Sequence, residues 1–231
     1  MSELRVALVA EGPTDAIVIE AALKALLASP FVLTQLQPEP THPKLGTGWG
    51  GVLRWCLEFA LRGHSSLEDD PTLPDFDLFV LHVDADVTEY RYSDVSPEIE
   101  TIAIERGWPA LPCSSPCPPP EGSVDEMRSR LLIWSGLDTT GPRTVFCVPS
   151  KAPEAWLVGA LFDQGHTLLN NLECNLRLES RLKALPRVER VRKKTREYRA
   201  RSQEITQAWA TVRQRCSQAE RFSSEVLAAV P

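Results

Sequence analysis

The segment RVALVAEGPTD, residues 5–15, passes from an apolar run into a polar turn. A short, almost entirely apolar run is typical of a strand that is buried on both faces of a sheet. Gly12 and Pro13 interrupt the run, and Thr14 is a good N-cap for the apolar residues at helical spacing over 16–28. The segment therefore predicts a strand, a tight turn and a helix.

Further along the chain, apolar runs alternate with helical patterns. Residues 31–36, 75–84 and 144–148 have the composition of strands, and residues 52–61, 97–106, 125–137 and 149–160 have that of helices. Residues 46–51 are a glycine-rich loop, and six prolines make residues 107–122 a loop as well. This alternation predicts an α/β fold with a parallel sheet of about four strands flanked by helices.

The C-terminal part of the chain has a different pattern. From Val188 to Cys216, apolar or small residues recur at alternating steps of three and four. This spacing predicts one long amphipathic helix, whose apolar seam faces either the body of the protein or a partner. We therefore expect two parts, an α/β domain over residues 1–165 and a helical extension over residues 166–231.

The composition excludes several classes of protein. Hydrophobic residues make up 43% of the 231 residues and charged residues 24%, which is typical of folded proteins and not of disordered ones. We find no apolar run of the roughly 18 residues that a membrane span requires, and no signal peptide, so we expect a cytoplasmic protein. Only Cys113 and Cys117 lie close together among the six cysteines, which predicts reduced thiols without a bound metal.

The net charge of −6 hides an asymmetry along the chain. Residues 181–201 contain ten Lys or Arg and two Glu, which gives this segment +8 and the remainder −14. The segment is either a solvated helix face or a surface that binds phosphates. Our candidates for contacts with nucleic acid are Arg187, Arg190, Lys193, Lys194 and Arg201, with Arg187, Arg190 and Lys194 expected on one side of the helix.

Acidic residues follow two of the predicted strands. Glu11 and Asp15 come after the first, and Asp84 and Asp86 come after the third. The carboxyl ends of parallel strands share one edge of a sheet, and residues two apart in an extended chain point to the same side. Crowded carboxylates repel one another unless a cation neutralises them, and oxygen ligands favour Mg²⁺ or Mn²⁺. A solvated turn or helix cap is the structural alternative for each acid taken alone.

His82 precedes Asp84 by two residues, so we expect it on the same side of the strand. A histidine that is simply packed in the strand is the more common case.

Three stretches resemble a known family. VAEGPTDA, residues 9–16, resembles the first motif of the Toprim domain, and HVDAD, residues 82–86, resembles its second, the DxD motif. VPSKAPEAWL, residues 148–157, is similar to a segment of small, stand-alone Toprim-like proteins related to the overcoming-lysogenisation-defect (OLD) nucleases. The resemblance covers roughly residues 5–160 and implies a Toprim-like, Rossmann-type sheet.

The resemblance also implies roles for individual residues. Glu11 would be a metal ligand or general acid/base, Asp84 and Asp86 would bind Mg²⁺, for which Mn²⁺ substitutes, and Asp15 would assist. Glu154 would complete a second metal site; its structural alternative is a first-turn helix glutamate. OLD-type sites also use a lysine, for which Lys194 is our candidate, and Lys193 and Lys194 are both expected within reach of the metal.

The function implied by this resemblance is a Mg²⁺-dependent nuclease. We expect DNA rather than RNA as the substrate, and the family suggests an antiphage defence effector that works with a separately encoded ATPase. We also expect a homo-oligomer formed through the C-terminal helix. Two alternatives stay open: a non-catalytic Toprim-like module that binds a partner, and a phosphoacceptor receiver domain in which Lys151 follows a late strand.

Overall fold

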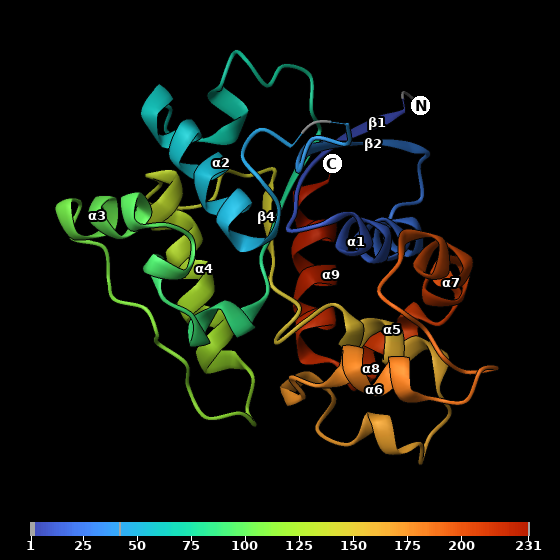
Figure 1. Cartoon of the computed structure of the whole chain (residues 1–231). Helices are drawn as coiled ribbons and strands as arrows, with labels where there is room; N and C mark the ends of the chain where they lie inside the picture. Colours follow the sequence, from blue (N-terminus) through green and yellow to red (C-terminus); the bar gives the residue numbers. More distant parts are fainter. Residues whose placement is uncertain (1–2, 42, 231) are drawn as a thin grey trace.

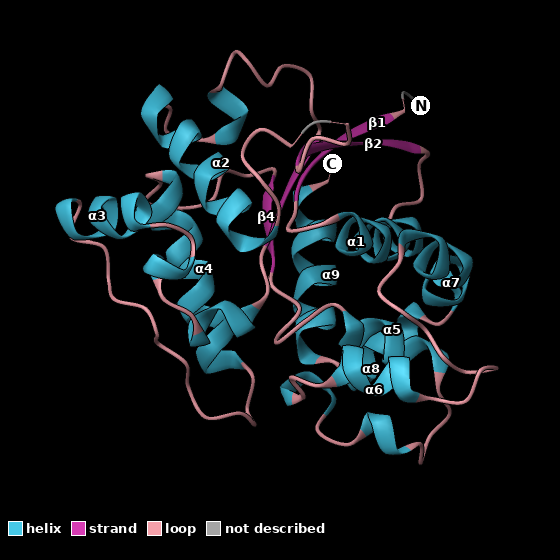
Figure 2. Cartoon of the chain, in the orientation of Figure 1, coloured by secondary structure: helices cyan, strands magenta, loops and turns pink. Residues whose placement is uncertain are grey.

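Four strands form a parallel sheet in the computed structural model, which describes residues 3–41 and 43–230 (Figure 2). The order across the sheet is β2-β1-β3-β4. The strands are β1 (Leu4–Val9), β2 (Phe31–Gln37), β3 (Leu78–His82) and β4 (Thr144–Cys147). All pairs are parallel, so the predicted α/β fold with a four-stranded parallel sheet is confirmed.

Helices cover both faces of this sheet (Figure 1). The helices are α1 (Pro13–Leu26), α2 (Gly48–Arg62), α3 (Pro97–Glu105), α4 (Glu121–Ser135), α5 (Glu154–Leu161), α6 (Leu178–Ala184), α7 (Thr195–Gln207), α8 (Trp209–Arg215) and α9 (Ser217–Ala229). Helices α2, α3 and α4 pack on one face, and the other six pack on the opposite face. The alternation of side chains along the strands builds these two cores: Val6 and Leu8 face α1, whereas Ala7 and Val9 face α2 and α4.

The chain changes direction across the sheet at β1. Helix α1 leads from β1 to β2 at one edge, and the next crossover returns past β1 to β3 on its other side. Strands β1 and β3 pair directly, with Val9 opposite Leu81, so their carboxyl ends lie side by side at a topological switch point. In open α/β sheets this crevice is where ligands bind. Glu11 and Asp84 follow these two strands.

The prediction of one long helix over residues 188–216 was wrong. Residues 186–194 are not helical, and the chain then forms α7 and α8, separated at Ala208. The 188–194 stretch carries four basic residues, which would repel one another at helical spacing. The buried side chain of Val191 anchors this non-helical segment to the core. Arg187, Arg190 and Lys194 therefore do not share the side of a helix.

The apolar seam of the C-terminal helices faces the body of the protein. Tyr198, Ile205, Trp209 and Val212 are buried in the same core as α1 and the sheet, and α7 packs along α1. Residues of the predicted helical extension thus contribute to the core of the α/β fold. The oligomer expected through this region remains a prediction.

Two local predictions also need correction. Asp84 to Asp86 is not fully extended, because a short 3₁₀ helix (Ala85–Glu89) begins directly after Asp84. Helix α2 begins at Gly48, inside the stretch predicted to be a loop. Its glycines allow close packing: a Cβ on Gly51 would lie 2.8 Å from the carbonyl oxygen of Gly46.

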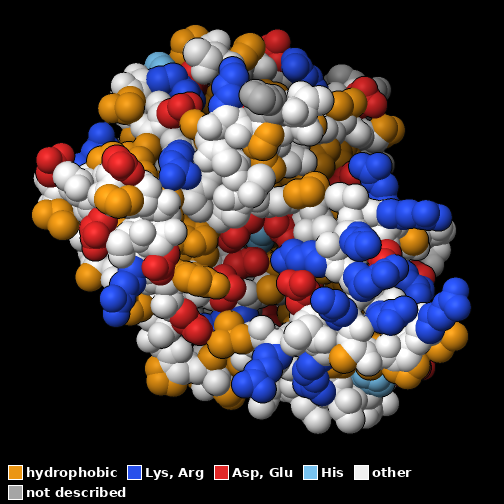
Figure 3. All heavy atoms as spheres, viewed as in Figure 1, with side chains coloured by type: hydrophobic (Ala, Val, Ile, Leu, Met, Phe, Trp, Pro, Cys, Tyr) orange, Lys and Arg blue, Asp and Glu red, His pale blue; other side chains and the backbone are white. Residues whose placement is uncertain are grey.

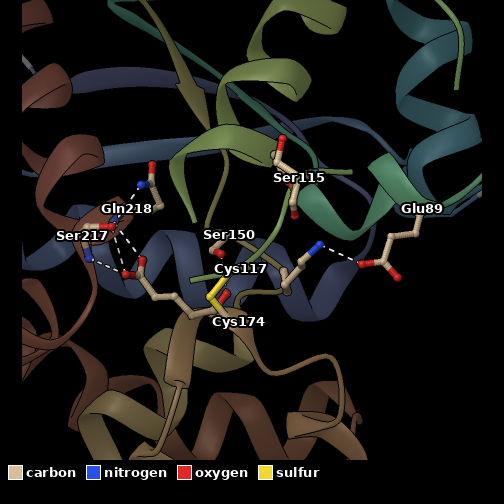
Figure 4. The surroundings of a disulfide bond; sticks show 10 residues. Glu89, Ser115, Cys117, Ser150, Cys174, Ser217 and Gln218 are labelled. Carbon is tan, nitrogen blue, oxygen red and sulfur yellow. Dashed lines mark hydrogen bonds and ion pairs between the residues drawn. A yellow bond between two sulfur atoms is a disulfide. The ribbon is translucent and has the colours of Figure 1, made fainter. Parts of the chain in front are cut away.

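A disulfide joins Cys117, in the proline-rich loop, to Cys174, after α5 (Figure 4). The expectation that all six thiols are reduced was therefore wrong for this pair. The two cysteines are 57 residues apart, a separation at which sequence gives no signal of pairing. Figure 4 shows Ser150 beside this bond, and its hydroxyl donates to the carbonyl oxygen of Glu173.

Within residues 3–41 and 43–230, none of the helices is both long enough and apolar enough to cross a membrane.

Candidate metal centre

Five carboxylates from four parts of the chain meet at the switch point. Glu11 follows β1, Asp15 lies in the first turn of α1, Asp84 and Asp86 follow β3, and Glu154 is the first residue of α5. These are the five residues predicted as metal ligands. A cavity of about 280 Å³ opens beside them, lined by Glu11, Asp15, Asp84 and Lys193 together with the 12–14 and 47–48 turns.

The backbone after β3 holds the first carboxylate in place. The amide N–H of Asp84 donates to Oε1 of Glu11 at 2.8 Å, which joins the ends of β1 and β3. The amide N–H of Gly48 donates to the carbonyl oxygen of Glu11 at 2.8 Å. The amide N–H of Ala85 donates to the carbonyl oxygen of Ser150 at 2.7 Å. The acidic loops are therefore fixed to their neighbours by main-chain contacts.

His82 belongs to this site, at its base. Its Nδ1 lies 3.0 Å from the carbonyl oxygen of Cys147, which can only accept, so Nδ1 carries the proton of the neutral ring. Burial lowers the pKa of His82 to about 4, which keeps the ring neutral. Its bare Nε2 faces Oδ1 of Asp84 at 3.6 Å, and neither atom has a hydrogen-bond partner within the described residues. Two acceptors placed in this way require a proton or a metal ion between them.

Burial and mutual repulsion raise the pKa of the carboxyl groups. Desolvation raises the pKa of Glu11 to about 8, assisted by the charges of Asp15 and Asp86. Desolvation is also the main cause for Asp15, with a pKa of about 7, and for Asp86, with a pKa of about 6. Burial and the four other carboxylates raise the pKa of Asp84 well above its ordinary value. A cation at this position would relieve the repulsion.

The donor set fits a divalent cation. One ligand atom each from Glu11, His82 and Asp84 lie within 4.8 Å of one another, which is close enough to share an ion. Carboxylate oxygens suit Mg²⁺, and an imidazole nitrogen adds affinity for Mn²⁺ and other transition metals. The sequence had identified His82 only through its position two residues before Asp84.

Glu154 is held by two residues from the C-terminal part. The hydroxyl of Tyr198, on α7, donates to Oε1 of Glu154 at 2.5 Å, and Nζ of Lys193 lies 3.3 Å from the same oxygen. Glu154 is 1% exposed, so these contacts fix its position firmly. Sequence reasoning missed Tyr198, because its place in the apolar seam gave no reason to assign it to a site.

Lys193 is the lysine that reaches the carboxylates. Partial burial lowers its pKa, but Glu154, Asp15 and Asp84 outweigh this effect, so that its pKa is raised and the ammonium stays charged. Lys194 is exposed and makes no ion pair with the five carboxylates among the described residues. Its backbone forms the N-cap of α7. The non-helical 186–194 segment thus directs Lys193, and not Lys194, into the site.

The predicted nucleic-acid contacts lie beside this centre. Arg187, Arg190 and Arg201 line a surface hollow of about 450 Å³, together with Arg192 and Arg196, which the sequence had not singled out. Figure 3 shows Asp and Glu side chains gathered in a depression of the surface, with Lys and Arg side chains along the side that carries α7 and the segment before it. Lys151 has a different partner, Glu89, with Nζ 2.8 Å from Oε1.

Comparison with known proteins gives no assignment, because no protein-family model, no curated protein and no solved structure matches the chain.

Proposed function

We propose that the chain is a metal-dependent hydrolase of phosphodiester bonds in nucleic acid, a nuclease of the Toprim type. The observation that carries the proposal is the convergence of five carboxylates and one lysine at the switch point of a parallel sheet. Burial of so many acids is costly unless a cation is bound. Motifs at residues 9–16 and 82–86 that resemble those of Toprim domains supply the ligands Glu11, Asp84 and Asp86.

Each residue has a distinct task in this proposal. Glu11, His82 and Asp84, with Asp86 beside them, would hold a Mg²⁺ or Mn²⁺ ion, and Asp15 and Glu154 would complete a second position. When bound, the metal polarises the scissile phosphate and lowers the pKa of a water molecule. Lys193 would place its positive charge against an oxygen of the phosphate, where charge develops as the bond breaks.

Tyr198 and Glu11 support this arrangement in different ways. The Tyr198 hydroxyl fixes Glu154, so that its carboxylate keeps one orientation. Glu11 would bind the ion as a deprotonated carboxylate, although burial and the neighbouring acids raise its pKa to about 8 when no cation is present. We also propose a cytoplasmic location and, from the resemblance, a separately encoded ATPase partner.

The test is hydrolysis of bis(p-nitrophenyl) phosphate and of plasmid, single-stranded DNA and RNA, with Mg²⁺, Mn²⁺ or EDTA. We expect cleavage that requires metal and falls at least about 100-fold in Asp84→Asn, because that change removes a ligand charge. Glu58→Gln, an exposed residue of α2, is the matched control. Cleavage that survives in EDTA or in Asp84→Asn would refute the proposal. A folded chain that binds metal without cleaving any substrate would favour the non-catalytic partner-binding module.

A further inference from the structure

A series of three aromatic rings runs from the core to the surface beside the metal centre. Trp134, on α4, is fully buried, and the ring centroid of Trp49, on α2, lies 6.2 Å from it at an interplanar angle of 26°. The ring of Tyr90 lies 6.3 Å from that of Trp49, at 31°. Tyr90 is 43% exposed, so the series ends in a ring with one side in solvent.

Tyr90 lies close to the carboxylates. It follows directly after the 3₁₀ helix that carries Asp86. The charge of Asp86, together with burial and the charge of Glu11, raises the pKa of its hydroxyl. An exposed aromatic ring at the edge of a phosphate-binding centre can stack on a nucleobase.

The arginine hollow lies on the other side of the metal centre. Trp49 packs on the core under α2 and α4, and Tyr90 contacts Trp49. The arginines lie on α7 and in the segment before it, and α7 packs along α1 on the opposite face of the sheet (Figure 1). Arg187, Arg190 and Arg196 have no carboxylate partner among the described residues, whereas Arg192 pairs with Glu197. Three unpaired guanidinium groups around one hollow form a site for phosphate oxygens.

We propose that the metal centre takes a single strand of a polynucleotide, with one base stacked on Tyr90 and phosphates on the far side held by Arg187, Arg190 and Arg196. The inference rests on the proposed function and adds the strandedness of the substrate. In a duplex each base is stacked inside the helix, where it cannot meet a ring next to the carboxylates. An unpaired strand presents its bases freely.

The test is equilibrium binding of a labelled 20-nucleotide single strand and of the same sequence as a duplex, with Ca²⁺ in place of Mg²⁺. We expect tighter binding of the single strand, and a loss of about tenfold in Tyr90→Ala. Tyr90→Phe keeps the ring and should retain the affinity. Tyr90→Leu keeps the apolar contact with Trp49 but removes the π face, so it should lose affinity even if the alanine variant folds poorly.

The arginines have their own readout. Each phosphate neutralised on a single strand contributes about −0.7 to the slope of log K against log salt, so Arg187→Gln combined with Arg190→Gln and Arg196→Gln should reduce the slope by about 2. An equally tight duplex, an unchanged Tyr90→Ala, or equal losses in Tyr90→Phe and Tyr90→Ala would overturn the inference. Metal-dependent hydrolysis of bis(p-nitrophenyl) phosphate, which has neither bases nor flanking phosphates, tests the proposed function separately.

Discussion

Replacing Glu11 with glutamine should stabilise the metal-free protein above neutral pH. Glutamine keeps the shape of the side chain and its carbonyl oxygen can still accept from the amide of Asp84. A carboxylate oxygen of Glu11 and one of Asp84 lie within 4.8 Å of each other, so the amide group of glutamine would replace a repulsive charge with a neutral donor group. The substitution therefore removes a buried charge without leaving a new unsatisfied group.

The magnitude follows from the raised pKa. Desolvation, with repulsion from Asp15 and Asp86, moves the pKa of Glu11 from 4.5 to about 8. A carboxyl group whose pKa is raised by folding contributes stability below pH 4.5, and this contribution is lost as the pH rises through 8. One unit is about 1.4 kcal/mol, and because the neighbouring carboxyls share the repulsion, we expect Glu11→Gln to gain about 2–4 kcal/mol at pH 8.

Thermal unfolding in EDTA at pH 5 and pH 8 measures this effect. For a chain of this size we expect Tm to rise by about 5–10 °C at pH 8 and by little at pH 5. Mg²⁺ should raise the Tm of the wild type, because the ion binds the folded state, and should raise that of Glu11→Gln much less. If Glu11→Gln unfolds at or below the wild-type Tm at pH 8, or if Glu58→Gln gains as much, the account of the acidic cluster is wrong.

Four further substitutions test other parts of the site and fold. Lys193→Gln should slow cleavage about 100-fold and Lys194→Gln less than tenfold; plasmid-nicking rates decide, and the reverse order would contradict the assignment of Lys193. Cys174→Ser should lower the free energy of unfolding by about 4 kcal/mol, since its bond to Cys117 closes a 57-residue loop; urea unfolding should show this loss without reductant and none with it. His82→Gln should weaken Mn²⁺ binding more than Mg²⁺ binding in calorimetry, and equal losses would exclude His82 as a ligand.

The positions of the acids could be predicted because they depend on topology alone. Apolar runs identified β1 and β3, and parallel strands place their carboxyl ends on one edge, whatever the packing around them. That β1 and β3 are neighbours was a condition that the sequence left open, and their direct pairing supplies it. The shared position of Glu11 and Asp84 at one edge of the sheet therefore follows from short-range sequence patterns and from the rule that crossovers between parallel strands are right-handed.

The contribution of the C-terminal part could not be predicted in the same way. The spacing from Val188 to Cys216 fits a helix throughout, and only the tertiary structure shows that residues before Thr195 are not helical. The position of the Lys193 side chain is determined by carboxylates that are distant in sequence, because a partly buried ammonium is stable only beside compensating charge. The disulfide between Cys117 and Cys174 is a long-range contact of the same kind.

His82 shows why the acidic cluster is better understood as a binding centre than as part of the scaffold. Without a metal ion, the bare nitrogen of His82 has only a protonated Asp84 as a partner, and the 3.6 Å separation is too long for a strong hydrogen bond. An apolar pair of similar volume would stabilise the sheet at that position. Unfavourable placements of this kind occur at functional sites, where a ligand offsets the cost. One ion contacting Asp84, His82 and Glu11 would satisfy all three groups. The arrangement that destabilises the metal-free protein is therefore the same arrangement that would bind the ion.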